Sequence, residues 1–188
     1  MPQQKYKTLI IDPPWLHNQL GNYGAHKHYR LMNMEQLKAM PIKNLTEENS
    51  AIFLWTTNST VRHALSLLDS WGFAEKGILT WVKMRMGLGN YLRNATEQVI
   101  LATRGKIKPL CKTQLSWFTA PTAGHSVKPN DVHVIAERMF PGPYLELFAR
   151  RKRPGWSVWG DQVESDIAIS GYPVPDSPAT RTKGGQDE

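Results

Sequence analysis

The sequence contains a single cysteine, Cys111, and that scarcity excludes two kinds of stabilisation. One thiol cannot form an internal disulfide, and it cannot supply the paired cysteines of a structural zinc site. The chain also lacks an apolar run of about 20 residues, the length of a membrane-spanning helix, and its first residues lack the architecture of a signal peptide. We therefore expect a soluble, cytoplasmic protein that binds no metal and no membrane.

The histidines offer one alternative to the expected absence of a metal. His26 and His28, with His17 nearby, are close enough in sequence to form part of a metal site, but no carboxylate partner or second cluster accompanies them. A polar loop facing a substrate explains the same residues without a metal. We favour the polar loop and keep the metal site as its alternative.

Positive charge is what the chain has in excess. It carries 23 Lys and Arg against 16 Asp and Glu, a net charge of +7. Residues 163–188 carry five carboxylates and two cations, so residues 1–162 hold a net +10. That excess favours a polyanionic partner, although many basic proteins bind none specifically. The end of the chain is rich in Pro, Gly, Ser and Thr, which predicts one domain over residues 1–162 and a flexible acidic tail over 163–188.

Short apolar runs alternate with helical stretches along the chain. Buried strands are expected at residues 6–11, 50–56, 78–82, 99–103 and 144–148, with an edge strand at 156–159. Helices are expected over 33–37, from a cap at Asn58 or Ser59 to Gly72, and from Lys128 with Pro129 in its first turn. This alternation predicts an α/β fold, a single Rossmann-like domain with a mostly parallel, twisted sheet and helices on both faces.

The most informative motif is Asp12-Pro13-Pro14-Trp15, directly after the first predicted strand. The prolines stiffen the loop and remove two backbone donors, so their carbonyls act only as acceptors. Asp12 adds a carboxylate, also an acceptor, and Trp15 adds a flat stacking surface. Acceptors beside a stacking surface suit a planar group that bears an amine, such as the edge of adenine. A proline-rich turn with a buried Trp is the simpler alternative for these four residues.

Methylation of the adenine amine explains why such a loop would be needed. The amine is a poor nucleophile because its lone pair is delocalised into the ring. Two acceptors on its N–H groups favour the pyramidal amine and stabilise the positive charge that develops on nitrogen. A rigid loop also holds the amine in line with the incoming methyl group.

The chain as a whole resembles the adenine N6-methyltransferase family that contains the catalytic subunit of the eukaryotic mRNA methyladenosine writer and its bacterial and phage relatives. The matching segments occur in the family's order. They are IIDPPW (10–15), HYRLMNMEQL (28–37), IFLWTTN (52–58), WGF (71–73), LTWVK (79–83), EQVILATRG (97–105), HSVKP (125–129), ERMFPG (137–142), LELFAR (145–150) and GWSVWGDQ (155–162). The resemblance implies a methyltransferase domain dependent on S-adenosylmethionine, with the catalytic loop preceding the cofactor motifs.

The resemblance also implies roles for individual residues. Asp12 would contact both the target amine and the amino group of the cofactor, and Lys128 would pair with the cofactor's methionine carboxylate. Glu146 would bond the ribose hydroxyls. The other residues implied to contact the adenosine half are Leu147, Phe148, Arg150, Asp161 and Gln162, and Asp161 stands where the family usually has Asn. Tyr29 and Ser126 are weaker assignments.

Substrate contacts are expected in loops near the catalytic motif, at residues 16–30, 84–94 and 107–124. The basic, glycine-rich stretch 83–93 contains Lys83, Arg85 and Arg93, which we expect to contact nucleic-acid phosphates, as Trp15 would stack on the base. A flexible surface loop is its alternative. The cations after Arg150 are expected at a solvated or phosphate-facing edge.

Three questions about function stay open at this level. We favour DNA over RNA, because a compact domain resembles the bacterial and phage branch of the family. A non-catalytic nucleic-acid-binding scaffold of the same fold is a rival, as is a methyltransferase for proteins or small molecules. A homodimer or a partner subunit is a further expectation, since 188 residues leave no room for a separate recognition domain.

Overall fold

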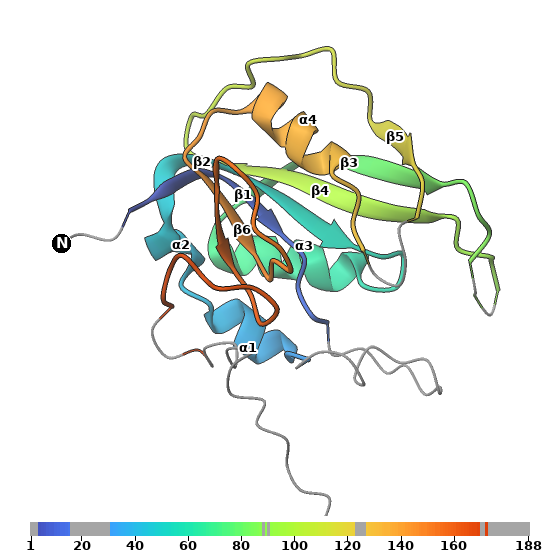
Figure 1. The fold of residues 1–188 in the computed structure, drawn as a ribbon, viewed down its shortest axis with the longest axis horizontal. Helices are drawn as coiled ribbons and strands as arrows, with labels where there is room; N and C mark the ends of the chain where they lie inside the picture. Colours follow the sequence, from blue (N-terminus) through green and yellow to red (C-terminus); the bar gives the residue numbers. More distant parts are fainter. Residues whose placement is uncertain are drawn as a thin grey trace, which may run out of the picture.

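A seven-stranded sheet with strand order β5-β3-β4-β2-β1-β6-β7 forms the centre of the protein (Figure 1). The structure is a computed structural model that describes residues 4–15, 31–87, 89, 91–122, 127–169 and 172. Its strands are β1 (Tyr6–Ile11), β2 (Thr46–Thr56), β3 (Ala74–Lys83), β4 (Thr96–Arg104), β5 (Trp117–Ala120), β6 (Tyr144–Leu147) and β7 (Trp156–Trp159). Its helices are α1 (Met34–Ala39), α2 (Ile42–Leu45), α3 (Val61–Trp71) and α4 (Asp131–Met139).

The sheet is mostly parallel, as the sequence predicted. Strand β1 pairs in parallel with β2 and β6, β6 with β7, and β3 with β5. Strand β4 is antiparallel to both of its neighbours, β2 and β3. One edge of the sheet therefore collects the carboxyl ends of six strands and the amino end of β4, and this is where an open α/β sheet binds its ligands.

Helices cover both faces, also as predicted, because successive strand residues point to opposite sides. Leu9 and Ile11 of β1 belong to the buried cluster beneath α1, α2 and α3, whereas Ile10 between them belongs to the cluster beneath α4. In Figure 1, α4 lies over one face of the sheet and α1–α3 lie across the other. Both faces of the central strands are thus shielded from water, as apolar strands require, whereas β3 and β5 keep exposed residues.

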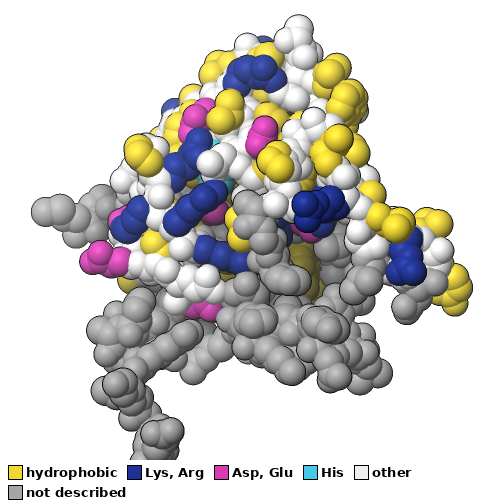
Figure 2. Space-filling model, turned by 45° about the vertical axis from the view of Figure 1, so that its right-hand side comes forward, with side chains coloured by type: hydrophobic (Ala, Val, Ile, Leu, Met, Phe, Trp, Pro, Cys, Tyr) yellow, Lys and Arg dark blue, Asp and Glu magenta, His cyan; other side chains and the backbone are white. Residues whose placement is uncertain are grey.

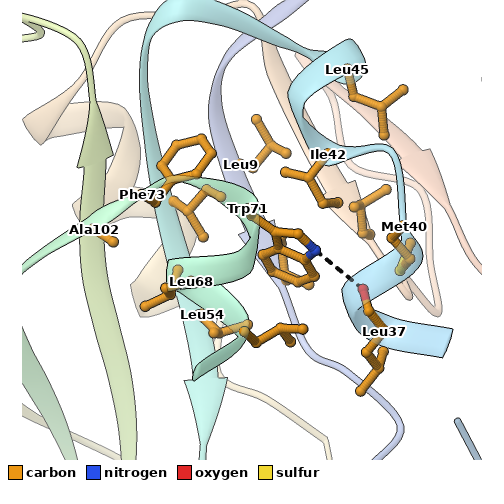
Figure 3. Packing of buried hydrophobic residues seen from close by; sticks show 14 of the residues in the cluster. Leu9, Leu37, Met40, Ile42, Leu45, Leu54, Leu68, Trp71, Phe73 and Ala102 are labelled. Carbon is orange, nitrogen blue, oxygen red and sulfur yellow. Dashed lines mark hydrogen bonds between the residues drawn. The ribbon is translucent and has the colours of Figure 1, made fainter. Parts of the chain in front are cut away.

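Helix α1 is attached to the body through Trp71, the last residue of α3. The indole N–H of Trp71 donates to the carbonyl of Leu37 at 3.1 Å, and both residues are buried (Figure 3). The start of α1 is closed by a capping box, in which the side chains of Asn33 and Gln36 each accept the other's backbone N–H at 2.9 Å. This capped helix confirms the short helix predicted at residues 33–37.

The start of α3 differs from the prediction. Thr60, not Asn58 or Ser59, occupies the N-cap position, and no side-chain bond caps the helix. Asn58 instead accepts a 2.7 Å hydrogen bond from the Gln98 side chain, which ties this turn to β4. The other end is as expected, because Gly72 adopts the left-handed conformation with φ 73°.

Several boundaries also differ from the prediction. Strand β2 begins at Thr46 rather than Ser50, because Thr46 pairs with Tyr6 of β1 across a register shift. The Arg104 side chain also donates to the carbonyls of Thr46 and Glu47. Helix α2 and strand β5 were not predicted. Helix α4 begins at Asp131, with Asn130 as its N-cap, so Pro129 lies before the helix and not in its first turn.

Packing continues past the domain boundary expected at residue 162. The Asp166 carboxylate accepts the backbone N–H of Val158 at 2.9 Å, and the Ser165 hydroxyl accepts that of Gly160 at 3.2 Å. Ile169 is buried in the same cluster as α1 and α3. The residues directly after β7 are therefore part of the folded body.

Candidate active site

Asp12 directly follows β1, which lies between β2 and β6 in the sheet. Its backbone N–H points to the carbonyl of Leu147, the last residue of β6, at 3.5 Å. Past Asp12 the chain turns sharply, because the Trp15 N–H donates to the Pro13 carbonyl at 2.9 Å. The carboxylate is thus held at the carboxyl edge of the sheet by a strand and a stiff turn.

Both proline carbonyls already accept one backbone hydrogen bond. Pro13 accepts from Trp15, and Pro14 accepts from the Met32 N–H, also at 2.9 Å. A carbonyl oxygen has two lone pairs, so each can still accept a second donor. Trp15 itself is half-buried against the core, and its indole N–H is buried with no hydrogen-bond partner among the described residues.

Lys128 and Asp12 lie 116 positions apart in the sequence and form an ion pair, with 2.8 Å between Nζ and Oδ2. Lys128 Nζ also lies 3.6 Å from Oε2 of Glu97 and 5.3 Å from the ring centroid of Trp55. Their side chains are about one-fifth exposed, so the pair is only partly shielded from water. The structure therefore brings together the two residues on which the sequence analysis relied most.

Glu97 is a member of the site that sequence reasoning did not single out. Its carboxylate contacts Lys128 through one oxygen and Lys83 through the other, at 2.5 Å between Lys83 Nζ and Oε1. Lys83 in turn lies over the ring of Trp81, 4.9 Å from its centroid. Because Glu97 pairs with Trp81 across antiparallel β3 and β4, its place in the site depends on a register that the motif alone does not reveal.

The two carboxylates determine the charge state of Lys128. Burial on its own lowers the pKa of the ammonium group, but the charges of Asp12 and Glu97 and the hydrogen bond to Asp12 outweigh it, so the pKa is raised above 10.5. Lys128 therefore stays protonated at neutral pH. Asp12, Lys128, Glu97 and Lys83 form one chain of alternating charge along the edge of the sheet, which we call the charge chain.

The ends of β6 and β7 form a second part of the edge. Phe148 follows β6 in the left-handed region with φ 63°, and its ring packs edge-on against Trp159 at 5.3 Å. The Ala149 N–H donates to the Trp159 carbonyl at 2.9 Å, and a Cβ on Gly160 would lie only 1.9 Å from the Ala149 carbonyl oxygen. A non-glycine residue at such a φ costs about 1–3 kcal/mol, and such strain often marks a ligand site.

The residues assigned to the cofactor do not all face this edge. Glu146 points toward α4, where its Oε2 lies 2.9 Å from Nε2 of the buried His133, whereas Leu147 is fully buried on the opposite face of the sheet. Asp161 and Gln162 follow β7 and are partly or fully exposed. Arg150 is half-buried just past Phe148.

The residues assigned to the substrate are likewise divided. Arg85 and Arg93 are exposed on the loop between β3 and β4, whereas Lys83 belongs to the charge chain. The remaining assignments, Tyr29, Ser126 and the three histidines at 17, 26 and 28, fall outside the described residues. Within the described ranges no group of three or more His, Cys, Asp or Glu side chains is arranged to hold a metal ion.

The three cations after Arg150 each contact another side chain of the protein. Arg151 donates to the Asn130 side chain, Lys152 pairs with Asp166, and Arg153 lies 3.5 Å from Glu137. Arg151 and Lys152 are nevertheless exposed, so this edge is solvated, one of the two alternatives that the sequence predicted. The described ranges also contain no helix long and apolar enough to cross a membrane.

An open, mostly parallel sheet with helices on both faces and an ion pair at its carboxyl edge defines an α/β protein whose candidate ligand site lies at that edge. The MT-A70 family model matches residues 6–162, and the chain belongs to this family of adenine N6-methyltransferases. The match contains the Asp12 turn, Glu97, Lys128 and the ends of both β6 and β7.

Curated relatives of the chain are bacterial and eukaryotic. The type II methyltransferase M.MunI of a Mycoplasma species is 28% identical, over 87% of this chain and 80% of its own length. The mouse N(6)-adenine-specific methyltransferase METTL4 is also 28% identical, over 84% of this chain. The N6-methyladenosine RNA methyltransferase MTA1 of Cryphonectria parasitica is 25% identical over the same share. The chain spans 37% and 52% of the latter two, so it corresponds to one part of each.

Proposed function

We propose that this protein transfers a methyl group from S-adenosylmethionine to the N6 amine of adenine in nucleic acid, with DNA favoured over RNA. The observation that carries the proposal is the Asp12 carboxylate, held in a proline-stiffened turn at the end of the central strand and paired with Lys128 at 2.8 Å. Membership of the MT-A70 family over residues 6–162 supports it.

The residues at the edge of the sheet have the chemistry to bind S-adenosylmethionine. Lys128 is cationic and suits the methionine carboxylate. The tight approach of Gly160 to Ala149 and the strained Phe148 shape the loops after β6 and β7, where we place the adenosine half beside Asp161 and Gln162. When bound, the cofactor supplies an electrophilic methyl group on a sulfonium sulfur, which leaves with the electron pair of its C–S bond.

The protein's part in the reaction is to prepare the amine. The Asp12 carboxylate and the Pro13 carbonyl accept the two N–H groups of the target amine, so that the nitrogen lone pair points to the methyl carbon. As the N–C bond forms, the same acceptors stabilise the positive charge on nitrogen. The nitrogen then loses one proton along its hydrogen bond to the Asp12 carboxylate and on to water.

The preference for DNA rests on the bacterial relative. M.MunI, named as a type II methyltransferase, is matched over 80% of its length, so this chain resembles a compact bacterial enzyme. The strongly basic body suits a polyanionic substrate, DNA or RNA alike. RNA is the alternative, because MTA1 is named as an RNA methyltransferase.

The decisive experiment uses radiolabelled S-adenosylmethionine with matched DNA and RNA oligonucleotides, followed by mass spectrometry of the nucleosides. We expect more N6-methyl-2′-deoxyadenosine from the DNA arm than N6-methyladenosine from the RNA arm. A stronger RNA arm would reverse the polymer preference, and label in neither polymer would contradict the proposed reaction.

A non-catalytic scaffold of the same fold is the second candidate. It needs neither a cofactor nor the pairing of Asp12 with Lys128. Calorimetry separates the two candidates without any turnover, because a scaffold gives no heat with S-adenosylmethionine and the enzyme does. Lys128→Gln should weaken that heat signal, because the proposed role of Lys128 is to bind the cofactor.

A further inference from the structure

The end of the β3–β4 hairpin exposes four large apolar side chains within nine residues. Met84 and Met86 are 75% exposed, Leu92 is 78% exposed and Tyr91 is 101% exposed. Isolated apolar side chains are common on protein surfaces, but four of them on the end of one hairpin favour an interaction site. Tyr91 in particular has both faces of its ring open to a partner.

The shape of this segment is determined by two glycines. The Gly87 N–H donates to the Asn94 carbonyl at 3.0 Å, and a Cβ on Gly87 would lie 2.4 Å from that oxygen. At Gly89 a Cβ would lie 1.9 Å from the carbonyl oxygen of Leu92. The two sides of the hairpin therefore approach each other closely at Gly87 and Gly89, while Tyr91 and Leu92 remain exposed.

The charge of the hairpin limits the kind of partner. Exposed Arg85 and Arg93 flank the apolar side chains, and no Asp or Glu occurs in the sequence between Lys83 and Glu97. Figure 2 shows hydrophobic and basic side chains next to each other on this projecting side of the molecule. Anionic groups regularly spaced beside flat apolar rings are the chemistry of a nucleic-acid strand whose bases are unstacked.

The base of the hairpin is attached to the catalytic turn. Lys83 ends β3, and the charge chain leads from it through Glu97 and Lys128 to Asp12. The Lys83 N–H donates to the Ala95 carbonyl, and Tyr91 precedes Ala95 by four residues. At about 3.3 Å per residue for a fully extended chain, Tyr91 lies at most about 13 Å from the base of the hairpin. The hairpin end is therefore connected to the amine-binding turn through a short segment and the charge chain.

We propose that the described residues at the end of this hairpin bind unpaired bases that flank the target adenine, with Tyr91 stacked on one base and Arg85 and Arg93 on the phosphates. This inference rests on the proposed function and specifies its substrate, a single strand or a locally opened duplex. Stacking is tolerant of sequence, because every base has a π-face. The hairpin therefore contributes affinity for unpaired bases rather than recognition of a base sequence.

The test measures binding of fluorescein-labelled, mixed-sequence single-stranded DNA by anisotropy, without cofactor. Tyr91→Ala should weaken binding about 5- to 150-fold, the range for loss of one stacked base, whereas Tyr91→Phe keeps the ring and the affinity. Binding of matched duplex DNA should change far less. Val134→Ala is the control, because Val134 is an exposed apolar residue on α4, away from the hairpin.

The outcomes separate this inference from the proposed function. If Tyr91→Ala binds single strands as wild type does, the stacking role is wrong even when the wild type methylates adenine. If Tyr91→Ala weakens binding but the wild type forms no N6-methyladenine, the hairpin inference holds and the proposed reaction fails. If Tyr91→Ala changes only the oligomeric state in sedimentation, the surface binds protein and the inference is overturned.

Discussion

At the scale of single residues, Asp12 has both a fixed position and a carboxylate suited to accept a hydrogen bond from an amine. Its backbone is anchored to β6 and its carboxylate to Lys128, so its orientation does not depend on a bound ligand. Such preorganisation is what makes an acceptor effective, because no reorganisation is needed when charge develops in the transition state.

Asp12→Ala should therefore lower kcat by at least about 100-fold, as the loss of a preorganised transition-state contact typically does. The fold should survive, because the turn is held by backbone hydrogen bonds of Pro13 and Pro14. Turnover at saturating cofactor and circular dichroism together check this prediction. Near-normal turnover with an intact spectrum would mean that the catalytic turn lies elsewhere.

Lys128 gives a prediction for alkaline pH. Its pKa is raised in the folded protein, so its ion pairs contribute their full stabilisation below the unfolded value of 10.5 and lose it as the pH rises through the higher folded value. The difference in unfolding free energy between wild type and Lys128→Met should be constant near neutral pH. It should shrink only as the pH rises above 10.5. Urea midpoints measured across alkaline pH check it.

The exposed Lys76 provides the matched control for that series, since Lys76→Met removes an ammonium group on β3 away from the charge chain. Glu97→Gln removes one of the two carboxylates that raise the Lys128 pKa. The stabilisation from the remaining ion pair should therefore be lost at a lower alkaline pH than in the wild type. A stability difference that does not vary with pH would contradict the assigned ion pairs.

At the scale of elements, the close contact between the loops after β6 and β7 is sensitive to an added methyl group. Gly160→Ala places a methyl group 1.9 Å from the Ala149 carbonyl oxygen, so one loop must move. We expect a loss of about 1–3 kcal/mol, which lowers Tm by roughly 2–12 °C in a chain of this size. Cofactor affinity should fall as well, because Phe148 moves with Ala149.

Gly77→Ala is the control for this prediction, because nothing lies within 4 Å of its added Cβ and its φ is not positive. Alanine is favoured over glycine inside a strand, so Gly77→Ala should be neutral or slightly stabilising. Thermal unfolding and calorimetric titration of both variants give the comparison. Equal behaviour of the two would show that the loops tolerate the extra methyl group.

The same elements show which features a sequence can predict. Strand β1 was predicted because a short apolar run that ends at two prolines is typical of a buried strand. The same pattern placed Asp12 at the end of that strand. Glu97 was missed because it enters the site only through the antiparallel pairing of β3 with β4. Strand β5 was missed because it is only four residues long at the sheet edge and two of the four are exposed. The α3 cap was missed because Asn58 binds Gln98 of β4 instead.

At the scale of the whole molecule, some cations are held in ion pairs and others are exposed to a binding partner. Lys152 and Arg153 are paired with Asp166 and Glu137, whereas Arg85 and Arg93 are exposed on the hairpin. Only cations that neutralise phosphates release counterions, and these set the salt dependence of binding. The net charge of the body therefore overstates the number of cations that contact a nucleic acid.

Arg85→Gln should reduce the slope of log affinity against log salt by about one, the value for one lost phosphate contact. Lys152→Gln should leave that slope unchanged, because its charge is already neutralised by Asp166. Titrations with single-stranded DNA at several salt concentrations check both. Equal slopes for Arg85→Gln and wild type would exclude Arg85 from the interface.

The position of β1 has a consequence for how the chain folds. Strand β1 joins β2, its near neighbour in sequence, to β6, with Thr8 paired to Tyr144. The chain between Thr8 and Tyr144 must close into one long loop before β1 and β6 can pair, and such closure is slow. We therefore expect the β6–β7 pair to dock after the rest of the sheet and to open before it. Amide hydrogen exchange should be fastest in β6 and β7, and S-adenosylmethionine should slow it there more than elsewhere. The loading of the cofactor would then also be the last step in the maturation of the enzyme.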